Sequence, residues 1–137
     1  MNTLRPWIAF SWVMLVGAMG GGGLLLRRAS LGDPSSFDLT WIRAFHAHGG
    51  VLLLMSIIYF IVLDGTALSA LAKRAGSAAV LLGTAALAGG FFVHALVGQP
   101  GEASIGNAVT IAGAAALAAG IGILVYGLLT TRASAQR

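Results

Sequence analysis

Four long apolar runs, separated by short polar stretches, organise this sequence. They cover residues 7–26, 44–63, 75–97 and 105–130, and histidines are their only side chains that ionise near neutral pH. About 20 apolar residues in a helix cross the roughly 30 Å hydrocarbon core of a bilayer. The pattern therefore predicts an all-α integral membrane protein, with four transmembrane helices in an up-down bundle that forms one domain over residues 1–137.

Composition agrees with a membrane protein. Hydrophobic residues make up 58% of the chain and charged residues only 9%, which is too little charge to cover a soluble domain. The net charge of +4 would suggest nucleic acid as a partner of a soluble protein, but here the cations lie at the ends of the apolar runs. We therefore expect the lipid bilayer as a partner and no nucleic acid. The absence of cysteine excludes thiolate metal sites, iron–sulfur clusters and covalently attached haem.

The distribution of basic residues predicts the orientation in the membrane. The first run is longer than the apolar core of a signal peptide, so we expect it to remain as a helix. With four spans, both termini and the connection between the second and third runs share one side. That side carries five of the eight cations, namely Arg5, Lys73, Arg74, Arg132 and Arg137. The positive-inside rule then places both termini in the cytoplasm, in a bacterial inner membrane.

Three histidines interrupt the apolar runs. His46 and His48 lie near the start of the second run, and His94 lies near the end of the third. In an antiparallel hairpin these positions are each roughly 6–11 Å from the same membrane face, which the predicted orientation makes the outer face. Ionisable side chains inside a membrane are costly and mark functional sites by default. The histidines are therefore expected to converge on a haem iron or a metal ion.

Only one member of the His46–His48 pair can face His94. Residues two apart in a helix point about 200° away from each other. Gly50 follows His46 by one turn, much as Gly90 precedes His94 by one turn, and small residues at both places would leave room for a flat macrocycle. This similarity favours His46 as the partner of His94, while His48 remains the alternative.

Polar residues near the same membrane face could complete such a site. Arg43 precedes His46 by three residues and can share its helix face, where it would pair with haem propionates or an acidic lipid. An ordinary anchor at the membrane surface explains Arg43 equally well. Gln99, Ser104 and Asn107 could each hydrogen-bond the second nitrogen of a ligating imidazole.

Glycines recur every seven residues in the last two runs. The positions are Gly76, Gly83 and Gly90 in the third run and Gly106, Gly113, Gly120 and Gly127 in the fourth. Seven residues make two helical turns, so each set forms a stripe of small residues that lets helices approach closely. The stripes predict close packing of the two helices against each other or against a partner chain.

One stretch resembles a known family. Residues 43–54 read Arg-Ala-Phe-His-Ala-His-Gly-Gly-Val-Leu-Leu-Leu, which resembles the second helix of subunit I of haem–copper oxidases and nitric oxide reductases. In that helix an early histidine ligates low-spin haem b. The stretch also looks like small four-span membrane proteins with His-x-His on the second helix. The resemblance implies haem b at His46 or His48. It speaks against oxygen reduction, because the chain lacks counterparts of the histidines that form the oxidase copper site.

These observations predict a membrane protein that binds haem b through two histidines. A bis-histidine iron has no open position, so we expect electron transfer, with quinol as a candidate donor or within a larger respiratory complex. Two alternatives remain: copper or zinc held by up to three imidazoles, and a structural subunit whose glycine stripes grip partner helices. A homo-oligomer or a larger membrane complex is expected because the chain has so little soluble mass.

Overall fold

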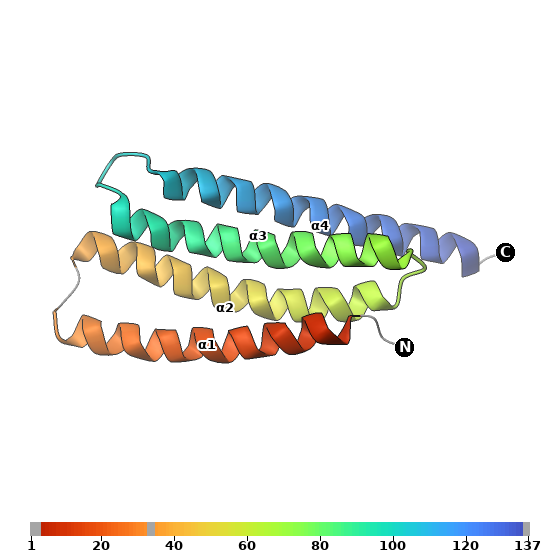
Figure 1. The fold of residues 1–137 in the computed structure, drawn as a ribbon, viewed down its shortest axis with the longest axis horizontal. Helices are drawn as coiled ribbons and strands as arrows, with labels where there is room; N and C mark the ends of the chain where they lie inside the picture. Colours follow the sequence, from red (N-terminus) through yellow and green to blue (C-terminus); the bar gives the residue numbers. More distant parts are fainter. Residues whose placement is uncertain (1–3, 33–34, 136–137) are drawn as a thin grey trace.

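The computed structural model describes residues 4–32 and 35–135, which form four helices (Figure 1). Their bounds are α1 Arg5–Ser30, α2 Ser36–Asp64, α3 Ala70–Val97 and α4 Ile105–Ala135. Each predicted span lies within one of these helices, and all four are long and apolar enough to cross a membrane. The described residues form helices and no strands, so the predicted all-helical architecture is confirmed for them. Consecutive helices run antiparallel.

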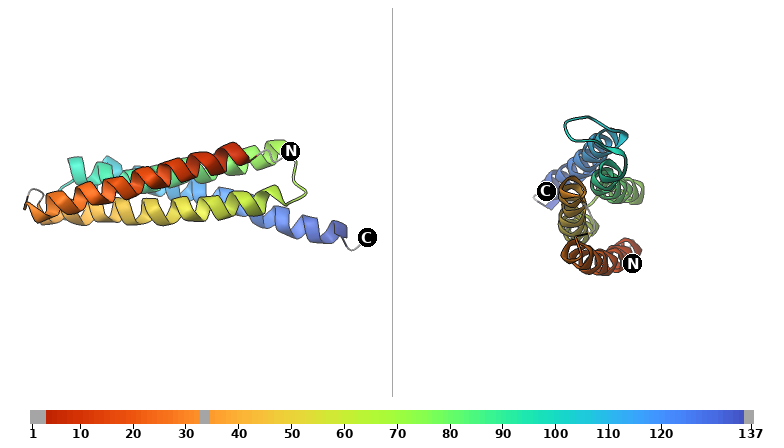
Figure 2. Two further views of the ribbon diagram at one scale, coloured as in Figure 1. Left: turned by 90° about the horizontal axis from the view of Figure 1, so that it is seen from below. Right: turned by 90° about the vertical axis from the view of Figure 1, so that its left-hand side faces the viewer.

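The helices form an open, curved row rather than a closed bundle. α1 packs on α2, α2 packs on α3, and α3 makes the most extensive contact, with α4. Seen end-on in Figure 2, α1 and the α3–α4 pair lie on opposite sides of α2 at the end where α2 begins. The outer faces of the two edge helices are therefore exposed, as Val13 in α1 and Leu129 in α4 illustrate. Burial within the chain alone does not cover these apolar surfaces.

Helix α2 begins well before the apolar span that starts at Ala44. Ser35 caps it: the Ser35 hydroxyl accepts a hydrogen bond from the Asp38 N–H at 3.1 Å, and Asp38 Oδ2 accepts the Ser35 N–H at 3.3 Å. This reciprocal capping box satisfies donors that the first helical turn leaves unpaired. The additional turns bring Phe37 and Trp41 to the end of α3, where the candidate site lies.

The two glycine stripes face each other across the α3–α4 contact. The facing pairs are Gly76–Gly120, Gly83–Gly113 and Gly90–Gly106. A Cβ atom added to Gly113 would lie 2.8 Å from the Gly83 carbonyl oxygen, and one added to Gly106 would lie 2.5 Å from the Gly90 carbonyl oxygen. The predicted close packing is therefore confirmed within the chain. Because these stripes are buried between α3 and α4, they do not form a free surface for a partner helix.

A cluster of large apolar side chains fills the end of the row where the chain starts. Its buried members are Leu4, Tyr59, Phe60, Leu63 and Val80. The Tyr59 hydroxyl donates to the Gly120 carbonyl oxygen at 2.8 Å and so joins α2 to α4. The histidines lie towards the opposite end, near the α3–α4 connection, where packing is more polar and aromatic. The large apolar cluster and the hydrogen-bonded His94 therefore lie at opposite ends of the row of helices.

Candidate functional site around His94

His94 lies in the last turn of α3 and is almost completely buried, with 4% of its surface exposed. Its Nδ1 atom is 2.7 Å from the hydroxyl oxygen of Ser104, in the connection to α4. Asn107 holds this connection in place, because its Oδ1 atom accepts the Ser104 N–H at 2.8 Å. The prediction that Ser104 would bond an imidazole nitrogen is confirmed, whereas Gln99 is exposed.

The hydrogen bonds around Ser104 assign the proton on His94. The Gly106 N–H donates to the Ser104 hydroxyl oxygen at 3.1 Å, and that hydroxyl can donate to Asn107 Oδ1 at 3.4 Å. With this polarity, His94 Nδ1–H donates to the Ser104 hydroxyl oxygen, and the Ser104 hydroxyl donates in turn to Asn107 Oδ1. The opposite polarity would place the ring proton on Nε2, for which the described residues provide no hydrogen-bond acceptor. We therefore assign the proton to Nδ1, which leaves a lone pair on Nε2.

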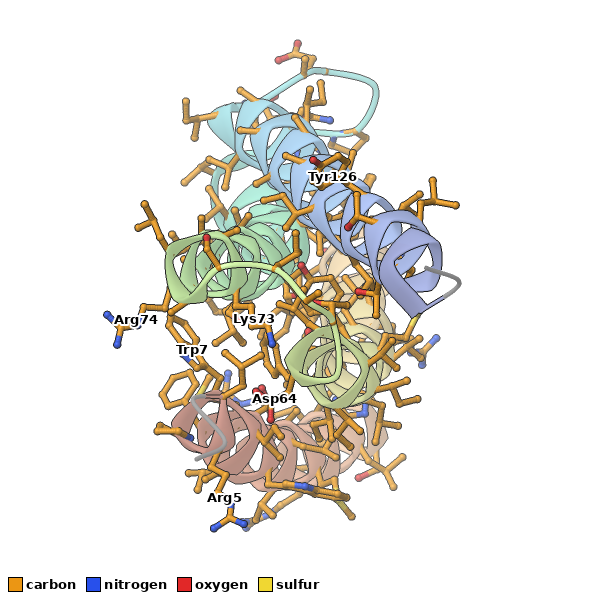
Figure 3. The ribbon with its side chains drawn as sticks, turned by 90° about the vertical axis from the view of Figure 1, so that its right-hand side faces the viewer. Arg5, Trp7, Asp64, Lys73, Arg74 and Tyr126 are labelled. Atoms are coloured by element: carbon orange, nitrogen blue, oxygen red, sulfur yellow. The ribbon has the colours of Figure 1, made fainter. Side chains whose placement is uncertain are left out.

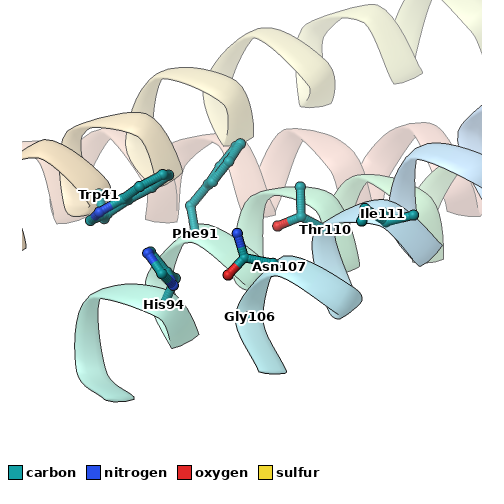
Figure 4. A pocket seen from close by; sticks show the side chains of 7 residues that line it. All are labelled: Trp41, Phe91, His94, Gly106, Asn107, Thr110 and Ile111. Atoms are coloured by element: carbon teal, nitrogen blue, oxygen red, sulfur yellow. The ribbon is translucent and has the colours of Figure 1, made fainter. Parts of the chain in front are cut away.

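Aromatic side chains surround the His94 ring. Trp41 meets it edge-on, with ring centroids 4.4 Å apart and planes at 84°, and the Phe37 ring lies 5.5 Å away. Beside His94 is a small pocket of about 150 Å³, shown in Figure 4. Trp41, Phe91, Asn107, Thr110 and Ile111 contribute side chains to its lining. The His94 ring thus borders a small pocket that is mostly apolar.

Glycines bring α4 against this site. A Cβ atom on Gly106 would lie 2.5 Å from the His94 backbone nitrogen and 2.8 Å from its Cβ, so only glycine permits this approach. The Gly90 position is likewise filled by α4, through Thr110 and the Gly106 carbonyl oxygen. The expectation that Gly90 leaves room for a macrocycle is therefore wrong, because its missing side chain admits a helix.

His48 lies on the side of α2 that faces α3. Its ring is 4.9 Å from the ring of Phe91, and its Nδ1–H donates to the Ala44 carbonyl oxygen at 2.8 Å. A carbonyl can only accept, so this bond assigns a proton to Nδ1 and, in the neutral ring, a lone pair to Nε2. The same Phe91 ring lies 5.9 Å from Trp41, which contacts His94. His48 and His94 therefore adjoin one continuous aromatic cluster.

His46 points the other way, towards α1. A Cβ atom added to Gly22 of α1 would collide with the His46 ring, 2.6 Å from its Nε2. The His46 ring lies against α1, whereas His94 adjoins Ser104 and Trp41, so the structure does not bring the expected His46–His94 pair together. A Cβ on Gly50 would meet no atom within 4 Å, so Gly50 borders open space. The angular separation of His46 and His48 was predicted correctly, and the member that adjoins the aromatic cluster of His94 is His48, not the preferred His46.

No group of three or more histidine, cysteine, aspartate or glutamate side chains in residues 4–32 and 35–135 could hold a metal ion. The three imidazoles diverge to α1, to Phe91 and to Ser104, so they do not assemble the metal site that the sequence suggested. Arg43 is exposed and pairs with no acidic side chain in the described ranges.

The contacts of Phe37 and Trp41 with His94 were not predicted from the sequence. From its position just before the second apolar run, Trp41 is expected only to lie at the membrane interface. The spacing of Ser35 and Asp38 was the available signal, since a capping box there extends α2 backward and places Phe37 and Trp41 on a helix beside His94.

Comparisons with known proteins do not assign the chain to a family. No family model, no curated protein and no solved structure matches the chain.

Proposed function

We propose that the chain is an integral membrane protein that binds haem b, with His94 Nε2 as one iron ligand. The observation that carries this proposal is the buried His94 ring whose Nδ1 bonds Ser104 and whose Nε2 keeps its lone pair. Ligating histidines almost always donate their other ring N–H to a neighbouring acceptor, which fixes the tautomer and orientation of the ring. Ser104 and Asn107 supply this support for His94.

The scarcity of ligands favours haem over copper or zinc. A protein-bound zinc or copper ion needs three or four ligands from side chains, and the described residues offer no such group. A haem iron needs only one or two protein ligands, because the porphyrin nitrogens supply the rest. The alternative of a structural subunit loses its main support, since the glycine stripes pack inside the chain.

His48 is our proposed second ligand in place of His46. It adjoins the same aromatic cluster as His94, and its Nδ1–H is held by Ala44 so that Nε2 is available. His46 would have to leave Gly22 and cross to the other side of α2.

The space around the two imidazoles sets a condition on binding. The pocket beside His94 measures about 150 Å³, which is smaller than a porphyrin, and the rings of Phe91 and Trp41 stand between His48 and His94. Haem binding therefore requires these two rings to turn away from the positions that they take in this structure. When bound, a bis-histidine haem supplies one-electron transfer, and we propose quinol or a larger respiratory complex as the redox partner.

The proposed setting is a bacterial inner membrane with both termini in the cytoplasm. Four apolar helices and exposed outer faces on α1 and α4 support insertion. The bias of basic residues towards the terminal side supports the orientation and puts His94 near the outer face. The test is a fusion of alkaline phosphatase, which is active only outside the cytoplasm, at Glu102 or at the C-terminus. We expect activity from the Glu102 fusion alone, and activity from the C-terminal fusion alone would contradict this orientation.

The test of the haem proposal is the absorption spectrum of detergent-purified protein, oxidised and then reduced with dithionite. We expect a sharp reduced α-band that His94→Ala abolishes, that added imidazole restores in part, and that Glu102→Gln in the same connection leaves intact. A featureless spectrum from protein produced with ample haem would overturn the proposal, and so would an unchanged band in His94→Ala.

A further inference from the structure

An apolar groove of about 550 Å³ runs between the first halves of α1 and α3. Its lining consists of Pro6, Trp7, Phe10 and Met14 from α1 and Ala78, Leu81, Leu82 and Ala85 from α3. Both α1 and α3 pack on α2, and their first halves line the groove between them. It lies on α1 and α3, apart from the pocket at His94. Its size is typical of sites for small apolar ligands, but it lacks the polar groups that orient most of them.

Two arginines stand at one end of this groove. Arg5 directly precedes Pro6, and Arg74 precedes Ala78 by one helical turn. Because α1 and α3 start at the same end of the row, both arginines lie at the same end of the groove. In Figure 3 both arginines point outward on either side of Trp7. Both are exposed, and neither forms an ion pair with an acidic side chain of the described residues.

The other charges at this end do not neutralise the arginines. The Lys73 ammonium donates to the Asp64 carbonyl oxygen at 2.7 Å, so it is already engaged with the end of α2. Asp64 carries the one carboxylate in the charged group that Figure 3 labels, against Arg5, Lys73 and Arg74. The end of the groove at Arg5 and Arg74 therefore has an excess of positive charge next to the apolar lining of the groove.

We propose that this groove binds an anionic phospholipid, with an acyl chain between α1 and α3 and the phosphate on Arg5 and Arg74. Basic pockets between transmembrane helices on the cytoplasmic side are suited to anionic headgroups. Arginine also forms two parallel hydrogen bonds to phosphate oxygens. A second copy of the chain fits less well, because a symmetric contact there would bring a second Arg5 and a second Arg74 next to the first pair. A neutral quinone would leave both arginines without a partner.

This inference depends on the membrane insertion in the proposed function, but not on haem. The first step is therefore to extract cell membranes with alkaline carbonate. Loss of the chain from the washed membranes would contradict membrane insertion itself. If the chain is retained, the lipid experiment below tests the groove alone, and the absorption spectrum tests haem separately.

Native mass spectrometry of the full chain can measure the preference for lipid charge. The protein is incubated in detergent with equal amounts of phosphatidylglycerol and phosphatidylcholine that carry identical acyl chains. We expect the anionic lipid to bind in excess. About 1 kcal/mol for each cation near a membrane surface corresponds to roughly fivefold, so replacing both arginines should reduce the excess by about 25-fold.

Matched variants separate the groove from general attraction to the surface. The double variant Arg5→Gln/Arg74→Gln should lose the preference, and Arg27→Gln/Arg28→Gln, at the far end of α1, should keep it. Ala85→Trp fills the groove and should lower lipid binding, whereas Ala115→Trp on the exposed surface of α4 should not. Equal binding of the two lipids, or equal losses in the matched pairs, would overturn the proposal.

Discussion

The contact between α3 and α4 and the contact between α1 and α2 both involve glycine-rich helices, but only the first brings two backbones together. Along α3–α4 the glycines recur every seven residues, and three of them on each helix face a glycine of the other. In α1 four glycines follow one another from Gly20 to Gly23. Three of them have no neighbour within 4 Å of an added Cβ, and for the fourth, Gly22, the three atoms nearest an added Cβ all belong to the His46 ring. Spacing, rather than the number of glycines, decides whether two helices interlock.

This difference bears on the site. The interlocked helices carry His94 and Asn107, and the connection between them carries Ser104, so their tight packing holds the hydrogen-bonded imidazole in one position. The looser α1–α2 contact receives His46, whose nitrogens have no hydrogen-bond partner in residues 4–32 and 35–135. One histidine of the His-x-His pair therefore fills a gap between helices, and the other adjoins the His94 cluster.

The largest effect is expected where a side chain would meet backbone atoms of the interlocked pair. A Cβ on Gly113 would lie 2.8 Å from the Ala86 carbonyl carbon, and a backbone cannot turn aside as a side chain can. We expect Gly113→Ala to destabilise the protein by about 1–3 kcal/mol. Unfolding in detergent, followed by circular dichroism, measures this loss. Gly122→Ala is the matched control on the same helix, since a Cβ there meets nothing within 4 Å. Equal losses of stability in the two variants would contradict the claim that close backbone contact at Gly113 is what makes glycine necessary there.

A smaller effect is expected at the α1–α2 contact, because the obstacle there is the ring of a side chain. Gly22→Val should displace the His46 ring and cost about 1 kcal/mol, since the ring can turn away. A double-mutant cycle with His46→Ala checks the reason. If His46 causes the loss, Gly22→Val should be nearly neutral once His46 is alanine. Additive losses would show that the valine acts elsewhere.

The smallest effect is expected at the unpartnered glycines of α1. Gly20 is exposed, and a Cβ there meets nothing within 4 Å, so Gly20→Ala adds no contact within the chain. Alanine is the better helix former, by up to about 1 kcal/mol in water, so we expect unchanged or slightly raised stability. The same unfolding measurement applies. A clear loss of stability would indicate that this face of α1 packs against another molecule.

The sequence predicted the four helices well because apolar length is a direct requirement of each span. It also predicted that the two glycine stripes make close helix contacts, although it left open whether α3 and α4 pack on each other or on a partner chain. It could not decide between His46 and His48, because the choice depends on where α1 and α3 lie around α2. The similarity of Gly50 and Gly90, which favoured His46, was misleading, because Gly90 contacts α4, whereas a Cβ on Gly50 would meet nothing within 4 Å.

The aromatic surroundings of His94 were harder to predict for a related reason. Phe37 and Trp41 precede the apolar span, so hydropathy alone assigns them to a loop or an interface. Their place beside His94 depends on the capped start of α2 and on the register of α2 against α3. Register between neighbouring helices is a tertiary property, and no local pattern in this sequence specifies it.

The central claim is that His48 and His94, rather than His46 and His94, form the proposed haem site. The most direct measurement is the electron paramagnetic resonance spectrum of the oxidised protein, recorded for His46→Ala and His48→Ala side by side. The account predicts that His46→Ala keeps the low-spin signal of a bis-imidazole iron and that His48→Ala converts it to a high-spin signal. A low-spin signal that survives in His48→Ala and disappears in His46→Ala would contradict the account.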